Sequence, residues 1–179
     1  MTEQPEPDTK DWTWVLDARC PDCGFDVRLP GRSDLAPLTL EMARRWESAL
    51  AGIDEPARRP SPAVWSPLEY ACHSRDVLAL ASFRVQLMLA EDAPRYPNWD
   101  QDETALAEDY SSQDIAVVRE QLAHEAERFA FVVAAVPDDG WARTGLRGDG
   151  AEFTVESFTR YLLHDPIHHL TDVTGESWE

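Results

Sequence analysis

The chain has 179 residues, 43% of them hydrophobic and seven of them tryptophan, which is enough to bury the core of a single domain. Its net charge of −18 argues against binding to nucleic acids, because that function needs a concentrated basic face. No apolar run approaches the roughly 20 residues that span a bilayer, and the acidic start of the chain does not resemble a secretory signal. We therefore expect a cytoplasmic protein with no nucleic-acid partner and no membrane partner.

The sequence divides into three parts. Residues 1–10 are polar and rich in proline, which predicts a disordered tail. Residues 11–33 combine tryptophans with turn residues, which favours an irregular strap or a short hairpin. The main domain is predicted to cover residues 34–179.

The strap contains a CxxC motif, formed by Cys20 and Cys23. The stretch CPDCGF resembles half of a zinc ribbon, but a structural zinc site needs four ligands and no second CxxC exists. With Cys72 the chain has three cysteines, an odd number that gives no disulfide framework. Three interpretations stay open: a reactive dithiol near an active site, a zinc site completed by other residues or another chain, and a turn with incidental thiols.

Four longer segments repeat apolar side chains every three or four positions, as helices with one buried face do. These segments are residues 34–53, 66–90, 112–136 and 154–174. Asp34 is a plausible N-cap of the first, and Ser66 caps the second, where Pro67 stands at the first helical position. Gly175 is a stop signal for the last. Four helices with varied connections predict an all-α four-helix bundle.

The connection at residues 92–110 is long, acidic and carries several aromatic side chains. Loops of this length in compact domains are usually functional or flexible. Two interpretations stay open: Tyr96, Trp99 and Tyr110 cover a site, or the segment is an exposed loop.

The stretch RYLLHDPIHHLTDV in the last helix holds three of the five histidines. His164 and His168 are four residues apart, so they lie on one face of the helix and can reach one metal ion. A catalytic zinc site has three protein ligands and an open position, and His73, in the apolar second helix, is the candidate third ligand. His169 lies about 140° from His164 around the helix and is expected to face elsewhere. The alternative is that the spacing is accidental and His73 is paired with a carboxylate or a carbonyl.

Two acids are placed to orient these histidines, since a metal-bound imidazole usually donates its other N–H to a carboxylate. Asp172 is one turn after His168, and Glu69 is one turn before His73. The alternative, which has equal weight, is that both acids are ordinary residues on the helix surface. His124, on the third helix among glutamates, is expected to be solvated.

Pro166 lies in the middle of the histidine stretch. It cannot donate a hydrogen bond to the carbonyl of Leu162, and its ring crowds that carbonyl. We therefore expect a local widening or a kink of the last helix between these two residues.

The segments WSPLEYACHSRDVL and YLLHDPIHHLTDV together resemble the DinB superfamily of four-helix-bundle metalloproteins. The resemblance covers roughly residues 34–175. It rests on a tryptophan before the second helix, a metal-binding histidine within it and an HxxxH in the last helix, which correspond here to Trp65, His73 and His164/His168. The resemblance implies an up-down-down-up bundle in which these three histidines bind a divalent ion, usually zinc or nickel.

The resemblance also implies a function, because the family includes mycothiol-dependent maleylpyruvate isomerase and thiol S-transferases. We expect a metal-dependent thiol S-transferase or isomerase that holds mycothiol as a thiolate and acts on a small-molecule electrophile. The alternatives are a metal-dependent hydrolase and a non-catalytic metal-binding module of a stress or damage response. Bundle faces in this family often pair, so a homodimer is expected. No catalytic residue beyond the metal ligands is assigned.

Overall fold

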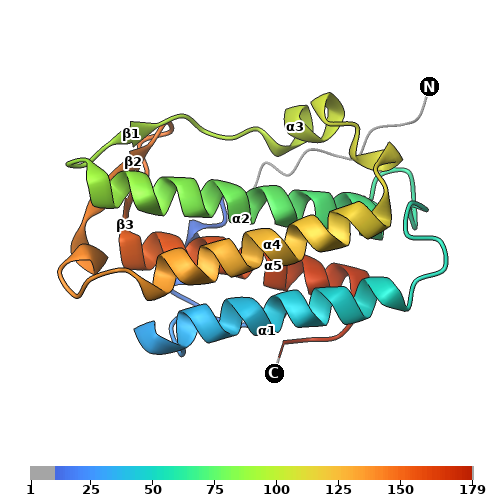
Figure 1. The fold of residues 1–179 in the computed structure, drawn as a ribbon, viewed down its shortest axis with the longest axis horizontal. Coiled ribbons are helices and arrows are strands. Elements are labelled where there is room, and N and C mark those ends of the chain that lie inside the picture. Colours follow the sequence, from blue (N-terminus) through green and yellow to red (C-terminus); the bar gives the residue numbers. More distant parts are fainter. Residues whose placement is uncertain (1–10, 179) are drawn as a thin grey trace.

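The computed structural model of the protein, which describes residues 11–178, is a bundle of four long helices (Figure 1). They are α1 (Arg32–Ala51), α2 (Pro67–Ala90), α4 (Ile115–Ala134) and α5 (Val155–Thr174). In Figure 1, α1 and α5 run in one direction while α2 and α4 run in the opposite one, and α4 packs against both α1 and α2. The predicted all-α bundle with up-down-down-up order is confirmed. Within the described residues, no helix is long and apolar enough to cross a membrane.

Local capping explains where the helices begin and end. The Ser66 hydroxyl accepts a hydrogen bond from the main-chain N–H of Glu69, whose carboxylate accepts one from the N–H of Ser66, so α2 begins as predicted. Gly175 ends α5 with a φ of 73°, a conformation that glycine adopts without strain. Helix α1 begins two residues earlier than expected, because Asp34 is not the N-cap. Its carboxylate instead accepts a hydrogen bond from the main-chain N–H of Gly31 at 2.8 Å.

The connection between α2 and α4 crosses the length of the bundle, which is why these two helices are parallel (Figure 1). It contains β1 (Arg95–Tyr96), α3 (Gln101–Ala107) and a 3-10 turn, η2 (Tyr110–Ser112). Sequence patterns predicted only a loop here, because each of these elements is too short to show periodicity.

A small sheet closes the end of the bundle where α2 ends and α5 begins (Figure 1). The strand order is β1-β2-β3. The central strand, β2 (Thr144–Arg147), pairs parallel with β1 and antiparallel with β3 (Glu152–Thr154). The turn η3 (Gly140–Ala142) precedes β2. Gly145 lets β2 lie against α2, since a Cβ there would stand 2.7 Å from the Met88 side chain. The sequence did not predict this sheet.

Helix α5 continues without interruption through Pro166. The proline leaves the carbonyl of Leu162 without its usual donor, and the local widening or kink predicted between these two residues stays a prediction. The same turn is also held from outside, since the fully buried indole of Trp46 donates a hydrogen bond to the Pro166 carbonyl at 2.9 Å. Leu163 and Ile167 lie in the core on the same turns.

The N-terminal segment, residues 11–31, contains the turn η1 (Thr13–Leu16) and packs directly onto the bundle. Val15, Phe25 and Val27 are buried in the common core. The guanidinium of Arg160 on α5 donates hydrogen bonds to the carbonyls of Val27 and Pro30, at 2.6 and 2.9 Å. The predicted disordered tail, residues 1–10, lies outside the described residues.

Candidate metal centre

Helix α5 presents two overlapping pairs of potential metal ligands. His164 and His168 form one pair, and Asp165 and His169 form a second pair one residue further along. Each residue rotates by about 100° around a helix, so the two pairs face different directions.

Each pair joins ligands from elsewhere in the chain. In the described part of the chain, two groups of at least three such residues have ligand atoms within 4.8 Å of one another. They are the histidine–aspartate cluster (His73, Asp165 and His169) and the cysteine–histidine cluster (Cys20, Cys23, His164 and His168).

The structure therefore divides the three histidines predicted as ligands between two clusters. His73 lies with Asp165 and His169, whereas His164 and His168 lie with the two cysteines of the CxxC motif. His169 does face away from His164, as expected, but this direction places it beside His73, with ring centroids 5.0 Å apart. Metal binding by these residues stays a prediction.

In the histidine–aspartate cluster, both imidazoles turn a ring nitrogen toward the same carboxylate oxygen. Oδ1 of Asp165 is 3.0 Å from Nε2 of His73 and 3.7 Å from Nε2 of His169. His73 is fully buried, and Asp165 has a side chain that is 34% exposed. The cluster thus has a closed side on α2 and an open side on α5.

Electrostatics keep the carboxylate of this cluster ionised. Burial alone would raise the pKa of Asp165, but the neighbouring His73 and His169 outweigh it, so its pKa lies well below the usual range. The pKa of Asp172 is also lowered, because its hydrogen bond with His169 outweighs the effect of burial. Two imidazoles and an ionised carboxylate form a donor set that fits a divalent transition-metal ion.

Of the two acids predicted to orient ligands, Asp172 contacts a different histidine and Glu69 has a different role. Oδ2 of Asp172 lies 2.8 Å from Nδ1 of His169 but 3.9 Å from Nε2 of His168, which is beyond hydrogen-bond distance. The carboxylate of Glu69 is paired with the guanidinium of Arg59 and caps α2.

The His73 ring lies between aromatic side chains. Trp99 stacks on it at 5.4 Å with an interplanar angle of 11°, and Trp65 lies 5.2 Å away. Its Nδ1 has no hydrogen-bond partner within residues 11–178. The ring is thus fixed by packing, and the 92–110 connection covers the cluster through Trp99, as one of the two sequence-based interpretations proposed.

A cavity of about 140 Å³ opens on the cluster. It is lined by Trp12 of the N-terminal segment, Gln101 of α3 and Tyr161 of α5, and it borders residues of both clusters on α5, namely His164, Asp165, His168 and His169. A second cavity, of about 280 Å³, shares Trp12, Gln101, Tyr161 and Asp165 and adds polar groups from α2, β2 and the connections beside them. Together the cavities give a small molecule room beside the potential ligands.

The cysteine–histidine cluster is more deeply buried. Sγ of Cys20 lies 3.6 Å from Nδ1 of His168, and Sγ of Cys23 lies 3.6 Å from Nε2 of His164. Both thiols are fully buried, and burial raises the pKa of Cys23 to about 12. Burial, assisted by His168, lowers the pKa of His164 to about 4, so its imidazole is neutral at pH 7.

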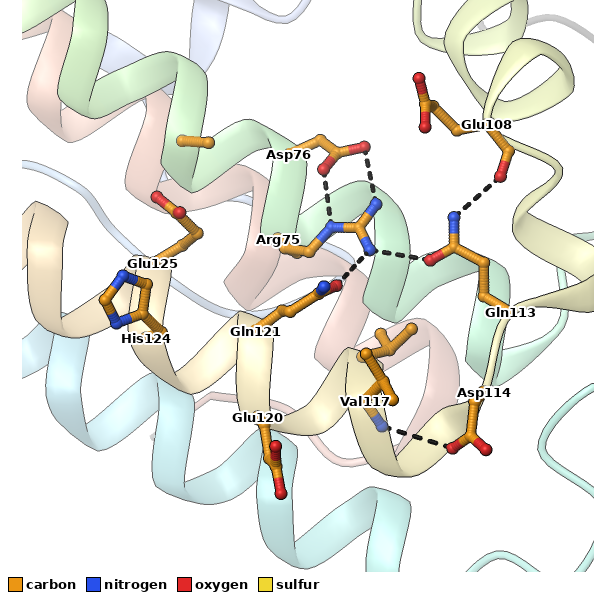
Figure 2. Close-up of a pocket in the computed structure, with 12 residues that line it drawn as sticks. Arg75, Asp76, Glu108, Gln113, Asp114, Val117, Glu120, Gln121, His124 and Glu125 are labelled. Carbon is orange, nitrogen blue, oxygen red and sulfur yellow. Dashed lines mark hydrogen bonds and ion pairs between the residues drawn. The ribbon is translucent and has the colours of Figure 1, made fainter.

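A wider groove of about 760 Å³ lies between α2 and α4 (Figure 2). Its central cation, Arg75, has its guanidinium bound to Asp76, Gln113 and Gln121. His124 is exposed on its rim among carboxylates, as predicted. This groove contains neither of the two ligand clusters, and we therefore place the candidate chemistry at α5.

Asp165 and His169 were not predicted as a pair of ligands. Their i, i+4 spacing equals that of His164 and His168, and this second pair was the signal that could have found them.

Three solved structures share this fold. One is YfiT from Bacillus subtilis, which is described as a probable metal-dependent hydrolase with an unusual four-helix bundle topology. It is 17% identical to this chain, and the TM-score is 0.70 over 82% of this chain and 89% of that chain. The mycothiol-dependent maleylpyruvate isomerase is 13% identical, with a TM-score of 0.63 over 83% of this chain and 62% of that chain. A variant of that isomerase with one histidine replaced by alanine gives a TM-score of 0.64 at 14% identity.

The sequence itself was compared with curated proteins and with family profiles. No curated protein matches the chain. The profile of the DinB superfamily (DinB_2) matches residues 34–173, which is well over half of the chain. The chain therefore belongs to the DinB superfamily.

Proposed function

We propose that the protein is a metal-dependent enzyme whose divalent ion is held by His73, Asp165 and His169. In this proposal the enzyme activates a small thiol, such as mycothiol. The activated thiol serves in S-transfer to a small electrophile or in the isomerisation of that electrophile. The observation that carries the proposal is the convergence of three ligand atoms from α2 and α5 beside a cavity. It revises the sequence-based ligand set, since His164 and His168 now belong to the other cluster.

The donor set fits a catalytic ion. Two histidines and one carboxylate are a known ligand set of catalytic zinc, in which a fourth position stays open. Such an ion supplies a lowered pKa for a thiol or a water in that position. The carboxylate of Asp172 accepts a hydrogen bond from Nδ1 of His169, which leaves the lone pair of Nε2 directed at the cluster.

The cavity residues can bind and orient an electrophile. Burial raises the pKa of Tyr161, so its phenol is neutral at pH 7 and can donate a hydrogen bond to a substrate oxygen. The Arg147 guanidinium donates to that phenol oxygen at 3.2 Å and fixes its direction. Trp12 and Trp99 provide apolar walls beside the ligand atoms.

Two nucleophiles suit this arrangement. A thiol is supported by the structural likeness to the mycothiol-dependent isomerase and by the polar side chains of the second cavity, including Arg84, Asn98 and Asp149, which suit a thiol rich in hydroxyl groups. Water is supported by the likeness to YfiT, described as a probable hydrolase. A metal-dependent hydrolase is therefore the second candidate function.

Metal analysis of single variants tests the site. We expect His73→Ala, Asp165→Asn and His169→Ala to lose one divalent ion per chain, whereas His124→Ala, which removes an exposed histidine, keeps it. His164→Ala separates the two ligand sets when it is compared with the double variant His73→Ala/His164→Ala. The double variant should hold one divalent ion less than His164→Ala, because His164→Ala leaves the His73 ion in place. Equal metal contents of these two variants would favour the sequence-based set of His73, His164 and His168.

The reaction class is tested with the same variants. The wild-type protein should conjugate mycothiol to an alkylating electrophile in a metal-dependent way, and His169→Ala should lose this activity. Hydrolysis of activated esters without any thiol dependence would favour the second candidate. A protein that keeps its ion in all three ligand variants would contradict both.

A further inference from the structure

We propose that Cys20, Cys23, His164 and His168 form a second, structural zinc site that fastens the N-terminal segment to α5. This inference goes beyond the proposed function and does not depend on it, because the two clusters share no residue.

The spacing of the four ligand atoms matches tetrahedral zinc. With Zn–S of about 2.3 Å and Zn–N of about 2.0–2.1 Å, a sulfur and a nitrogen on neighbouring corners of a tetrahedron are about 3.5–3.6 Å apart. Two of the four sulfur–nitrogen distances are 3.6 Å, from Cys20 to His168 and from Cys23 to His164. All four atoms lie within 4.8 Å of one another, so one ion can reach them with small side-chain shifts.

Two local backbone features each supply two ligands. The Gly24 N–H donates to the Cys20 carbonyl and the Cys20 N–H donates to the Phe25 carbonyl, both at 3.0 Å, which closes a tight turn around the CxxC motif. Gly24 has a φ of 76°, which glycine accommodates without strain. On α5 the i, i+4 spacing brings the two imidazoles to the same side. A turn with two cysteines facing a helix with two histidines is a Cys₂His₂ zinc arrangement.

Burial indicates a structural rather than a catalytic ion. Four protein ligands leave no open position for a substrate. Cys20 and Cys23 are fully buried, the His164 residue is 3% exposed and the His168 side chain is 12% exposed. The Trp12 ring packs against both imidazoles, 5.7 Å from His164 and 4.9 Å from His168, and lines the cavity that they border.

Other chemical roles of the two thiols fit less well than a zinc site. A reactive dithiol has to be accessible to its substrate, whereas both thiols are fully buried. A disulfide would join the two sulfurs, but each is free and faces an imidazole nitrogen. A two-iron cluster with two cysteine and two histidine ligands places them on different irons, which needs wider spacing than 4.8 Å.

The site would join parts of the chain that are 141 and 148 positions apart in the sequence. It lies beside Trp12, which contacts His164 and His168 and also lines the cavity at Asp165. The main-chain N–H of Trp178 donates to the Cys23 carbonyl at 2.7 Å, so the C-terminal residues close over the same turn. A zinc ion here would hold one wall of the candidate active site.

Zinc content of cysteine variants tests the proposal. Cys20→Ser/Cys23→Ser should lose one zinc per chain relative to the wild-type protein. Cys72→Ser is the matched control, since this thiol is also fully buried but faces Gln113 on the far side of α2, and it should keep the full zinc content. Equal zinc in the double variant and the wild type would overturn the proposal.

A second measurement keeps this test separate from that of the catalytic ion. In His73→Ala the remaining zinc should show two sulfur and two nitrogen neighbours by X-ray absorption, and its cobalt derivative should show sulfur-to-cobalt charge-transfer absorption. Absence of sulfur neighbours overturns the Cys₂His₂ site. Their presence in a His73→Ala protein that has lost no metal overturns the proposed catalytic ligands instead.

A measurement on the wild-type protein tests the proposal even if the double variant does not fold. Titration of the wild-type protein with an organomercurial should release one zinc per chain as two thiols react. Thiol modification without zinc release would overturn the proposal.

Discussion

The hydrogen bond between Asp172 and His169 gives a quantitative test of the catalytic ion. Replacing such an outer partner of a metal-bound histidine typically weakens metal affinity about 10–100-fold, which is about 1.4–2.8 kcal/mol. Asp172→Asn keeps an oxygen that can accept from Nδ1 and loses only the charge, and the Asp172 side chain is 35% exposed. We therefore expect about a tenfold loss for Asp172→Asn and a loss closer to 100-fold for Asp172→Ala.

The measurement is competition for the bound ion against a chromophoric chelator. Glu120→Gln removes the same charge from an exposed position on α4 and should bind the ion as tightly as the wild-type protein (Figure 2). The cysteine-bound zinc should be unaffected, because Asp172 is 3.9 Å from His168. If both Asp172 variants bind the His73 ion as tightly as Glu120→Gln, the assignment of His169 as a ligand is refuted.

Three further predictions concern stability. Glu69→Gln should lower the free energy of unfolding by about 2–3 kcal/mol in urea, because it breaks the charged hydrogen bonds with Arg59. Burial would raise the pKa of Glu69 in the folded protein, but the hydrogen bonds with Arg59 outweigh it and lower this pKa. The stability that the pair contributes is therefore present above the unfolded pKa of about 4.5 and is lost as the pH falls through the folded pKa. The free energies of unfolding of the wild type and the variant should converge at low pH. Gly145→Ala should cost about 1–3 kcal/mol in the same assay, because its Cβ would lie 2.7 Å from Met88. Trp46→Phe removes the indole donor to the main chain of α5 and should cost about 1–3 kcal/mol by thermal unfolding. Unchanged free energies of unfolding in urea for Glu69→Gln and Gly145→Ala, or an unchanged unfolding temperature for Trp46→Phe, would contradict these assignments.

The bundle was predictable because its information is local. Apolar side chains at helical spacing mark the buried faces, and the Ser66 and Gly175 caps are read from a few neighbouring residues. The contacts around Pro166 were not predictable in the same way, because the indole that binds its carbonyl belongs to Trp46, 120 positions earlier in the sequence. The three-stranded sheet also depends on contacts between distant segments, so its short strands gave no periodic signal.

The site was predictable in composition but not in grouping. The sequence shows that His164 and His168 share a face, and the structure agrees. Which face turns toward His73 depends on how α5 is rotated in the bundle. That rotation is set by the burial of Leu163 and Ile167 against the other helices, which no motif records. A shift of one residue, about 100°, separates the predicted pair, His164 and His168, from the pair that lies beside His73, Asp165 and His169.

The two clusters on α5 are coupled by the stiffness of the helix that carries them. Because His164 and Asp165 are adjacent, as are His168 and His169, any rotation or shift of this turn moves both ligand pairs together. An ion at the cysteine–histidine cluster would fix the rotation of α5 and so keep the second pair directed at His73. By thermodynamic linkage, if an ion at the cysteine–histidine cluster strengthens metal binding at the histidine–aspartate cluster, an ion at the histidine–aspartate cluster strengthens binding of the first by the same free energy. Such an ion would make the CxxC segment part of the same functional unit as the bundle, although the family profile begins only at residue 34.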